Sequence, residues 1–286
     1  MRLCRFDDNR LGLFLGEDIR NVTPALDVLP AVRWPLPRGD LMIANLGALR
    51  KRIAELVANA RSVEPEAVKL LSPVANPGKI IAAPVNYQAH LDEARADAGI
   101  NFGQPVKTID DYGLFLKASS SLVGCDEGVV VGHGERRIDH EVELAVVIGP
   151  GGRDIAEEDA LSHVAGYTIG LDMSVRGTED RSYRKSLDTF TVLGPHLVTA
   201  DEIDDPGALD LGLSVNGEVR QASNTSHLIY TIPKLIAYAS AAYTLDPGDV
   251  ILTGTPAGVG PVRPGDVLSA WVEGIGRMDI AVRGTP

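Results

Sequence analysis

Three carboxylates in two short segments have the residue types and the spacing of a divalent-metal site. Glu141 and Glu143 lie two positions apart in one apolar run, and Asp172 ends a second apolar run. Residues two apart in a strand point to the same face, so the two glutamates project together. Burying such like charges unpaired is costly, and a bound cation removes that cost. Carboxylate oxygens suit magnesium, manganese or calcium rather than zinc.

The alternative is that Glu141 and Glu143 lie on a solvated outer face of a sheet, the usual setting of a Glu-x-Glu pair. Two observations favour a buried site instead. Ala145 and Val147, the next residues on the same face, are apolar. Asp172 also ends an apolar strand, a position where functional sites are commonly built.

His90 and Glu93 form a second pair that could do chemistry. They lie three positions apart in a helix-like segment, and this spacing places both side chains on one helix face. A carboxylate beside a histidine orients the imidazole and raises its proton affinity, which produces a plausible general base. The same spacing is also that of a surface helical pair worth a few tenths of a kcal/mol, and spacing alone favours the surface pair.

Lys185 and the loop at residues 253–260 could bind an anion. A lysine near an acidic metal site could hold a substrate carboxylate or a developing oxyanion, although one solvated lysine among many is the default interpretation. The loop TGTPAGVG follows a short apolar strand and offers backbone N–H groups and hydroxyls. It lacks the Gly-Lys-Ser/Thr ending of a phosphate-binding P-loop, which excludes that class of nucleotide site.

Short strands and a few helices must position these residues. Residues 1–74 are expected to form a small N-terminal module with a hairpin over 2–6 and 11–15 and a helix near 46–57. Residues 75–286 are expected to form the catalytic domain, and Asn216-Gly217 predicts a hairpin turn within it. In this second part, we expect strands at 80–85, 129–131, 142–148, 165–171, 211–215 and 250–252, and helices at 88–98, 156–163 and 232–242. Strands outnumber helices without regular alternation, which predicts an α+β, β-rich fold with a mixed sheet or barrel.

Composition excludes several functional classes. The net charge is −12 and the isoelectric point is about 4.9, which argues against nucleic-acid binding, because that depends on clustered basic residues. Cys4 and Cys125 are too few for a disulfide framework and lack metal-site spacing. The N-terminus has no apolar core of signal-peptide length, and the apolar runs are too short to span a bilayer. We therefore expect a cytoplasmic protein with no membrane partner.

Six segments, taken in order, resemble those of the fumarylacetoacetate hydrolase family. The resemblance spans residues 79–286, and the combination is specific although no single segment is. The segments are 79–90 (KIIAAPVNYQAH), 115–124 (FLKASSSLVG), 139–147 (DHEVELAVV), 165–176 (AGYTIGLDMSVR), 185–195 (KSLDTFTVLGP) and 252–260 (LTGTPAGVG).

The resemblance implies a role for each matching residue. It implies a mixed β-roll catalytic domain, a homodimer, and Mg²⁺ or Mn²⁺ as the cofactor. By motif, the metal ligands would be Glu141, Glu143 and Asp172. The acid/base pair would be His90 and Glu93, and Lys185 would polarise or anchor the substrate. The residues contacting the substrate's acidic end would be Arg176 and Thr255.

The resemblance also implies the reaction class, which is metal-dependent chemistry on 2-oxo or diketo acids, of the kind used in the catabolism of aromatic compounds. Our leading prediction is hydrolysis of a carbon–carbon bond in a 2,4-diketo acid such as an acylpyruvate or fumarylpyruvate. The alternatives are isomerisation of 2-hydroxyhepta-2,4-diene-1,7-dioate-type acids, decarboxylation of oxaloacetate-type acids, or a metal-stabilised dimer without catalysis.

Two departures from the family pattern bear on the substrate. Ala118 stands where a proline often follows the lysine of the second segment, and the linker between Glu93 and Phe115 is long enough to form a lid.

Overall fold

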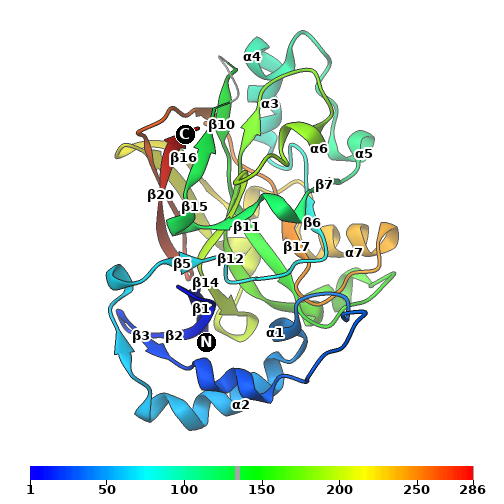
Figure 1. The fold of residues 1–286 in the computed structure, drawn as a ribbon. Coiled ribbons are helices and arrows are strands. Elements are labelled where there is room, and N and C mark those ends of the chain that lie inside the picture. Colours follow the sequence, from blue (N-terminus) through cyan, green and yellow to red (C-terminus); the bar gives the residue numbers. More distant parts are fainter. Residues whose placement is uncertain (133–135, 286) are drawn as a thin grey trace.

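The computed structural model describes residues 1–132 and 136–285, and three β-sheets form its framework (Figure 1). A twelve-stranded sheet has the order β4-β3-β2-β1-β14-β12-β11-β17-β6-β7, with β5 beside β1 and β8 beside β14. A five-stranded sheet has the order β16-β15-β19-β20-β9, and a three-stranded sheet the order β13-β10-β18. The α+β, strand-rich class expected from the sequence is therefore confirmed.

The strands of the large sheet are β1 (Arg2–Phe6), β2 (Arg10–Leu15), β3 (Asp18–Asn21), β4 (Ser62–Val63), β5 (Leu70–Leu71), β6 (Ile80–Ala82), β7 (Phe115–Lys117), β8 (Leu122–Gly124), β11 (Val142–Ile148), β12 (Val164–Asp172), β14 (Thr191–Thr199) and β17 (Val250–Leu252). The strands of the smaller sheets are β9 (Val129–Val131), β10 (Ile138–His140), β13 (Ser174–Val175), β15 (Asp210–Val215), β16 (Glu218–Asn224), β18 (Gly260–Pro261), β19 (Val267–Val272) and β20 (Gly276–Gly284).

The α-helices are α1 (Leu41–Ala44), α2 (Leu46–Leu56), α3 (Gln88–Ala96), α4 (Ala98–Asn101), α5 (Ile109–Tyr112), α6 (Arg181–Arg184) and α7 (Ile232–Ala242). The 3₁₀ helices are η1 (Thr23–Val28), η2 (Val57–Asn59), η3 (Pro65–Ala67), η4 (Ser119–Ser121), η5 (Cys125–Glu127), η6 (Glu157–His163), η7 (Ala200–Glu202), η8 (Pro206–Ala208) and η9 (Thr225–His227). Helices α3, α4 and α6 gather at one end of the molecule, and β2, β3 and α2 lie at the other (Figure 1).

The centre of the large sheet is apolar on both faces. Every residue of β11, β12 and β14 is buried, and their Val, Leu and Ile side chains belong to the two hydrophobic clusters on either side of the sheet. Burial of such a side chain stabilises the fold by about 1.5–3 kcal/mol. These three strands therefore form a fully buried, closely packed centre of the fold.

The first strand extends this central sheet. Strand β1 pairs antiparallel with β14, with Leu3 opposite Leu197. On helix α2, Leu49 and Ile53 recur four positions apart and are fully buried, as the helical spacing predicts.

The predicted turn at Asn216-Gly217 agrees with the structure, whereas the predicted helix at 156–163 does not. Asn216 and Gly217 have φ of 51° and 83° in the β15–β16 turn, as a type I′ hairpin requires. The segment expected to be a helix at 156–163 is the 3₁₀ helix η6 instead. Only Ala160 in it is buried, so little packing energy favours a longer α-helix there.

None of the helices in the described residues has the length and apolar composition needed to cross a bilayer.

Candidate metal centre and active site

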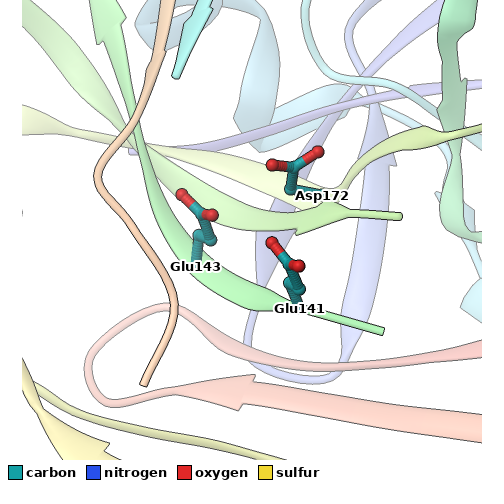
Figure 2. A group of neighbouring side chains, drawn as sticks. All are labelled: Glu141, Glu143 and Asp172. Carbon is teal, nitrogen blue, oxygen red and sulfur yellow. The ribbon is translucent and has the colours of Figure 1, made fainter. Parts of the chain in front are cut away.

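The three predicted carboxylates lie side by side on adjacent strands. Strands β11 and β12 pair antiparallel, with Glu143 opposite Gly170, and the Asp172 N–H donates to the Glu141 carbonyl at 2.9 Å. One carboxylate oxygen from each of Glu141, Glu143 and Asp172 lies within 4.8 Å of the other two. Figure 2 shows the three groups directed into the same space. Two strands therefore bring together residues about thirty positions apart in the sequence.

These carboxylates are buried, not solvated. The exposed fractions are 4% for Glu141, 2% for Glu143 and 1% for Asp172. The prediction of a buried site is therefore confirmed, and the outer-face alternative is wrong. Because burying three like charges is unfavourable, compensating positive charge is required nearby.

Two lysines supply part of this compensation. The Lys185 ammonium donates to Glu141 Oε2 and to Asp172 Oδ2, each at 2.7 Å, and to Ser174 Oγ at 2.5 Å. Lys117, whose side chain is fully buried, donates to Asp172 Oδ1 and to the Phe190 carbonyl. Burial lowers the pKa of Lys117, while its attraction to Asp172 opposes that shift.

An arginine network holds Glu141 from the other side. Arg176 donates through Nε to Asp139 at 2.8 Å and through Nη2 to Glu141 at 2.9 Å. Arg137 then joins Asp139, at 2.7 Å, to Asp97 at the end of α3, at 2.9 Å. This chain of ion pairs links a predicted metal ligand to the segment that follows α3.

The two glutamates have opposite electrostatic environments. Burial opposes ionisation of Glu141, but Lys185 and Arg176 outweigh it and lower its pKa. Burial raises the pKa of Glu143 well above its usual value, and the Asp172 and Glu141 charges add to this effect. Among the described residues, Glu143 has one hydrogen-bond donor, the Gly254 N–H at 2.6 Å, and no lysine or arginine in a salt bridge with it.

The residues present fit a divalent cation. Three hard oxygen donors converge within 4.8 Å, and no described lysine or arginine forms a salt bridge with Glu143, whose pKa is raised by burial and by its acidic neighbours. A cation of the magnesium or manganese type satisfies both features. The donor set contains only oxygen, which argues against a structural zinc site.

His90 and Glu93 form a hydrogen-bonded pair at the start of α3. His90 Nδ1 lies 2.9 Å from Glu93 Oε2. A carboxylate accepts hydrogen bonds only, so Nδ1 carries the proton and Nε2 of the neutral ring has the free lone pair. His90 is buried and lines the same pocket as the three carboxylates, which contradicts the surface-pair alternative.

The loop between β17 and β18 holds Thr255 in this pocket. Gln221 on β16 donates to Thr255 Oγ1 at 2.7 Å, and its carbonyl oxygen accepts from the Val142 N–H at 3.1 Å. Gly254 has φ of 104°, and a Cβ there would lie 2.6 Å from the Asn86 side chain. This loop position therefore requires glycine.

A pocket of about 430 Å³ brings most of the predicted residues together. It is lined by His90, Glu141, Glu143, Asp172, Arg176, Lys185 and Thr255. Glu93 is hydrogen-bonded to His90 but does not itself line the pocket. The linker after α3 also contributes lining residues, including Phe102 and Tyr112, as expected of a segment that covers a site. The geometry is therefore consistent with the predicted roles, which remain predictions.

Sequence reasoning missed three residues that support the site. Lys117 and Gln221 bind site residues directly. Asn86 ties the start of α3 to the Thr253 carbonyl at 2.8 Å and the Tyr230 carbonyl at 2.9 Å. The available signals were Lys117, which ends a short apolar strand, and Asn86, which follows one. Gln221 has no distinguishing local pattern.

Comparison with known proteins gives consistent results. The family model for the fumarylacetoacetate (FAA) hydrolase C-terminal domain matches residues 79–283. A maleylpyruvate hydrolase of Aquipseudomonas alcaligenes is 56% identical over 285 residues, which is 99% of each chain. A mitochondrial oxaloacetate tautomerase of Xenopus laevis is 36% identical, covering 96% of this chain and 88% of that protein.

A solved structure agrees with these sequence matches. The crystal structure of maleylpyruvate hydrolase from Sphingobium sp. SYK-6, in complex with manganese(II) and pyruvate, is 40% identical. It covers 100% of both chains with a TM-score of 0.85.

Proposed function

The chain belongs to the fumarylacetoacetate hydrolase family, and we propose that it is a divalent-metal-dependent enzyme that hydrolyses a carbon–carbon bond in a 2,4-diketo acid. One observation carries this proposal. The three buried carboxylates and the His90–Glu93 pair line or adjoin a single pocket. The 56% identity to a maleylpyruvate hydrolase supports hydrolysis of an acylpyruvate-type substrate.

Glu141, Glu143 and Asp172 would hold Mg²⁺ or Mn²⁺. When bound, the cation would supply Lewis-acid polarisation of the substrate's 2-oxo acid end. The relative crystallised with manganese and pyruvate supports this choice of metal and of ligand class.

His90 would act as the general base. His90 lines the pocket and Glu93 would hold the proton on Nδ1, which would leave the Nε2 lone pair free to act as the base. Nε2 would take a proton from water as the water oxygen bonds to the distal carbonyl carbon. The carbon–carbon bond then breaks, with its electron pair going to the pyruvate enolate. A proton returns to the enolate carbon, so that the products are pyruvate and a carboxylic acid.

Lys185, Arg176 and Thr255 would position the substrate's acidic end. Lys185 lies next to two of the proposed metal ligands, where its ammonium would stabilise a developing oxyanion. Thr255 is held by Gln221. Arg176 is fixed by Asp139 and Glu141, which orients its guanidinium at the edge of the pocket.

A second candidate function keeps the same residues and changes the reaction. The 36% identity to an oxaloacetate tautomerase favours keto–enol isomerisation of an oxaloacetate-type acid, and isomerisation of unsaturated dioates or decarboxylation would use the same site. The linker after α3 would decide between these reactions and hydrolysis, because it determines whether a water and a distal carbonyl fit beside His90.

The wider assembly is part of the proposal. Residues 1–74 would form an N-terminal module, and residues 75–286 a catalytic domain with the β-roll architecture of the family. The enzyme would act as a homodimer in the catabolism of aromatic compounds.

The test is a product assay on three substrates with Mn²⁺ present. An acylpyruvate, oxaloacetate and 2-hydroxyhepta-2,4-diene-1,7-dioate are each incubated with the protein. Pyruvate, the second carboxylic acid and carbon dioxide are measured as products, and the ultraviolet absorbance of the enol or diene is followed to detect isomerisation. Pyruvate from the acylpyruvate with a matching amount of the second acid supports the hydrolase. Turnover confined to either of the other two substrates would overturn it in favour of isomerase or decarboxylase chemistry.

A further inference from the structure

We propose that Arg181, assisted by Arg184, binds a second carboxylate on the substrate and so makes the enzyme selective for 2,4-diketo acids that are also dicarboxylic. This inference rests on the proposed function. It concerns the part of the substrate beyond the cleaved bond, where a second carboxylate would lie. Neither arginine has a role in the proposed chemistry, and neither is among the residues that the sequence analysis selected.

One helical turn carries three cations that line the pocket. Arg181, Arg184 and Lys185 have the spacing i, i+3 and i+4, which puts them on one face of the turn formed by α6. The Lys185 N–H donates to the Arg181 carbonyl at 3.0 Å, so the helical turn extends to Lys185. All three residues line the pocket. One helical turn rises about 5.4 Å, and Arg181 therefore lies about that far along the helix from the residue that contacts Glu141 and Asp172.

Neither arginine is held in a salt bridge by a described residue, although the charges of Asp180, Glu179 and Glu141 lie close enough to act on them. The nearest acidic residues along the chain are engaged elsewhere. Glu179 accepts two hydrogen bonds from Arg136, at 2.8 and 2.9 Å, and Asp180 caps α6 through the Ser182 N–H at 2.8 Å.

The contacts that the two arginines do make leave donors for an anion. The Arg181 guanidinium lies 3.8 Å from the centroid of the Tyr112 ring, an arrangement that holds its plane. One donor also reaches the Tyr112 hydroxyl, so most of its N–H groups stay available. Arg184 donates through Nε to the Glu179 carbonyl at 2.8 Å and through Nη1 to the Val175 carbonyl at 3.1 Å. Burial lowers the pKa of Arg184, and the nearby charges of Arg176 and Arg181 add to this effect.

A substrate carboxylate beside Arg181 would accept hydrogen bonds from guanidinium N–H groups that have no partner among the described residues. Guanidinium groups bind carboxylates with paired, charge-assisted hydrogen bonds. Arg176 cannot supply the same net charge, because it already pairs with Asp139 and Glu141. A substrate held by its 2-oxo acid end near Lys185 would extend along α6 and place a terminal carboxylate at Arg181.

The test compares two substrates that differ at the distal end. Maleylpyruvate carries the second carboxylate, and acetylpyruvate has a methyl group there. The wild type is expected to prefer maleylpyruvate. In Arg181→Gln, we expect kcat/KM for maleylpyruvate to fall by about 10- to 100-fold, mainly through KM, because one charged hydrogen-bonded contact is lost. Activity on acetylpyruvate should change less than about twofold.

Three further variants test whether the effect depends on the charge, on the paired donors and on the position of Arg181. Arg277→Gln, at an exposed position on β20, controls for loss of one positive charge from the whole protein and should leave both substrates unaffected. Arg181→Lys should fall between the wild type and Arg181→Gln, because it keeps the charge without the paired donors. Tyr112→Leu removes the ring beneath Arg181 and should weaken maleylpyruvate turnover selectively.

The outcomes separate this inference from the proposed function. Equal losses on both substrates in Arg181→Gln would show that Arg181 orders the linker through Tyr112, which would overturn the inference. An unchanged preference for maleylpyruvate would also overturn it, while the hydrolase function would stand. If the wild type with Mn²⁺ cleaves neither substrate, the proposed function fails and the inference fails with it.

Discussion

Gly258 donates its backbone N–H to Glu93 across 2.8 Å, and this bond joins α3 to the loop that carries Thr255. The second carboxylate oxygen of Glu93 lies 2.9 Å from His90 Nδ1. Glu93 is therefore oriented from two directions, and it fixes the His90 ring in turn. Gly258 has φ of 99°, and a Cβ there would lie 1.9 Å from the Arg220 carbonyl. The backbone can approach this closely only because the residue is glycine.

Replacing Glu93 by glutamine should abolish most of the activity. The glutamine oxygen can still accept from Gly258, but its NH₂ group would then face His90 Nδ1 and favour the tautomer that places the proton on Nε2. General-base catalysis contributes typically 10²–10⁴-fold, and we expect kcat to fall by roughly 10²-fold or more with little change in KM. Steady-state kinetics on an acylpyruvate with saturating Mn²⁺ measures this.

Asp92→Asn is the matched control for Glu93→Gln. Asp92 is the preceding residue on α3, is exposed, and bonds to Gln88 rather than to His90. Its activity should equal that of the wild type. Equal losses in both variants would indicate damage to the helix and would contradict the role of the His90–Glu93 pair.

Glu143→Gln and Glu141→Gln should have opposite effects on the metal-free protein. Burial and the neighbouring carboxylates raise the pKa of Glu143, so removing its charge relieves repulsion. Glu141 is paired with Lys185 and Arg176, and removing its charge leaves buried cations unpaired, which costs about 3–5 kcal/mol. Thermal unfolding in excess chelator should give a Tm at least equal to the wild type for Glu143→Gln and a lower Tm for Glu141→Gln.

Both variants should bind Mn²⁺ weakly. Loss of an outer-shell partner already costs about 10- to 100-fold in metal affinity, and loss of a direct ligand should cost more. Titration calorimetry measures this directly. If Glu143→Gln kept the wild-type affinity for Mn²⁺, Glu143 would not be a ligand.

Gln221→Met should uncouple Thr255 from the sheet. Gln221 donates to Thr255 and to the Pro256 carbonyl and accepts from the Val142 N–H. Leaving such buried groups unsatisfied costs about 1–3 kcal/mol, so urea unfolding should show a loss of that size. KM should rise because Thr255 is no longer held. Gln88→Met, at an exposed position on α3, should change neither quantity; a comparable loss there would mean that the effect is not specific to the loop.

His196 should make the fold sensitive to acid. Burial lowers the pKa of His196 to about 4 from its ordinary 6.5, more than its bond to the Ile275 carbonyl raises it. Between these pH values the unfolded chain binds a proton that the folded chain does not, so stability falls as pH falls from 6.5 to 4. The loss is on the order of 3 kcal/mol.

His196→Gln removes this titration and can keep a donor to Ile275. The difference in unfolding free energy between the wild type and this variant should therefore change with pH over that window and be constant above it. Parallel curves from pH 7 to pH 4 would show that His196 does not titrate in this way.

The sequence predicts those features of the fold that neighbouring residues determine. Strand 142–148 and helix 232–242 have the predicted bounds, because their apolar patterns are continuous. Strand β14 was not predicted. It contains Pro195, which lacks a backbone donor and argues locally against a strand. Its neighbours in the sheet nonetheless hold it there, since β14 pairs with the nine-residue strand β12 on one side and with β1 on the other.

In the site, too, the features set by neighbouring residues could be predicted and those set by strand pairing could not. The Glu-x-Glu spacing and the terminal Asp172 are local, and they predict correctly that the three carboxylates lie together. That these carboxylates bind a metal stays a prediction. Some of the partners that neutralise or orient the site residues come from distant segments. Lys117 is 55 positions from Asp172, and Gln221 is 34 positions from Thr255. No local pattern encodes such contacts, because they depend on how the strands pair.

The most direct test of the central claim is acylpyruvate turnover by the wild-type protein with Mn²⁺, with Mg²⁺ and with excess chelator. Loss of the diketo ultraviolet absorbance and release of pyruvate are followed together. We predict that both occur with either metal, in equal amounts, and that both stop in chelator and resume when metal is restored. Equal turnover with and without chelator, or loss of absorbance without pyruvate, would contradict metal-dependent carbon–carbon bond hydrolysis at Glu141, Glu143 and Asp172.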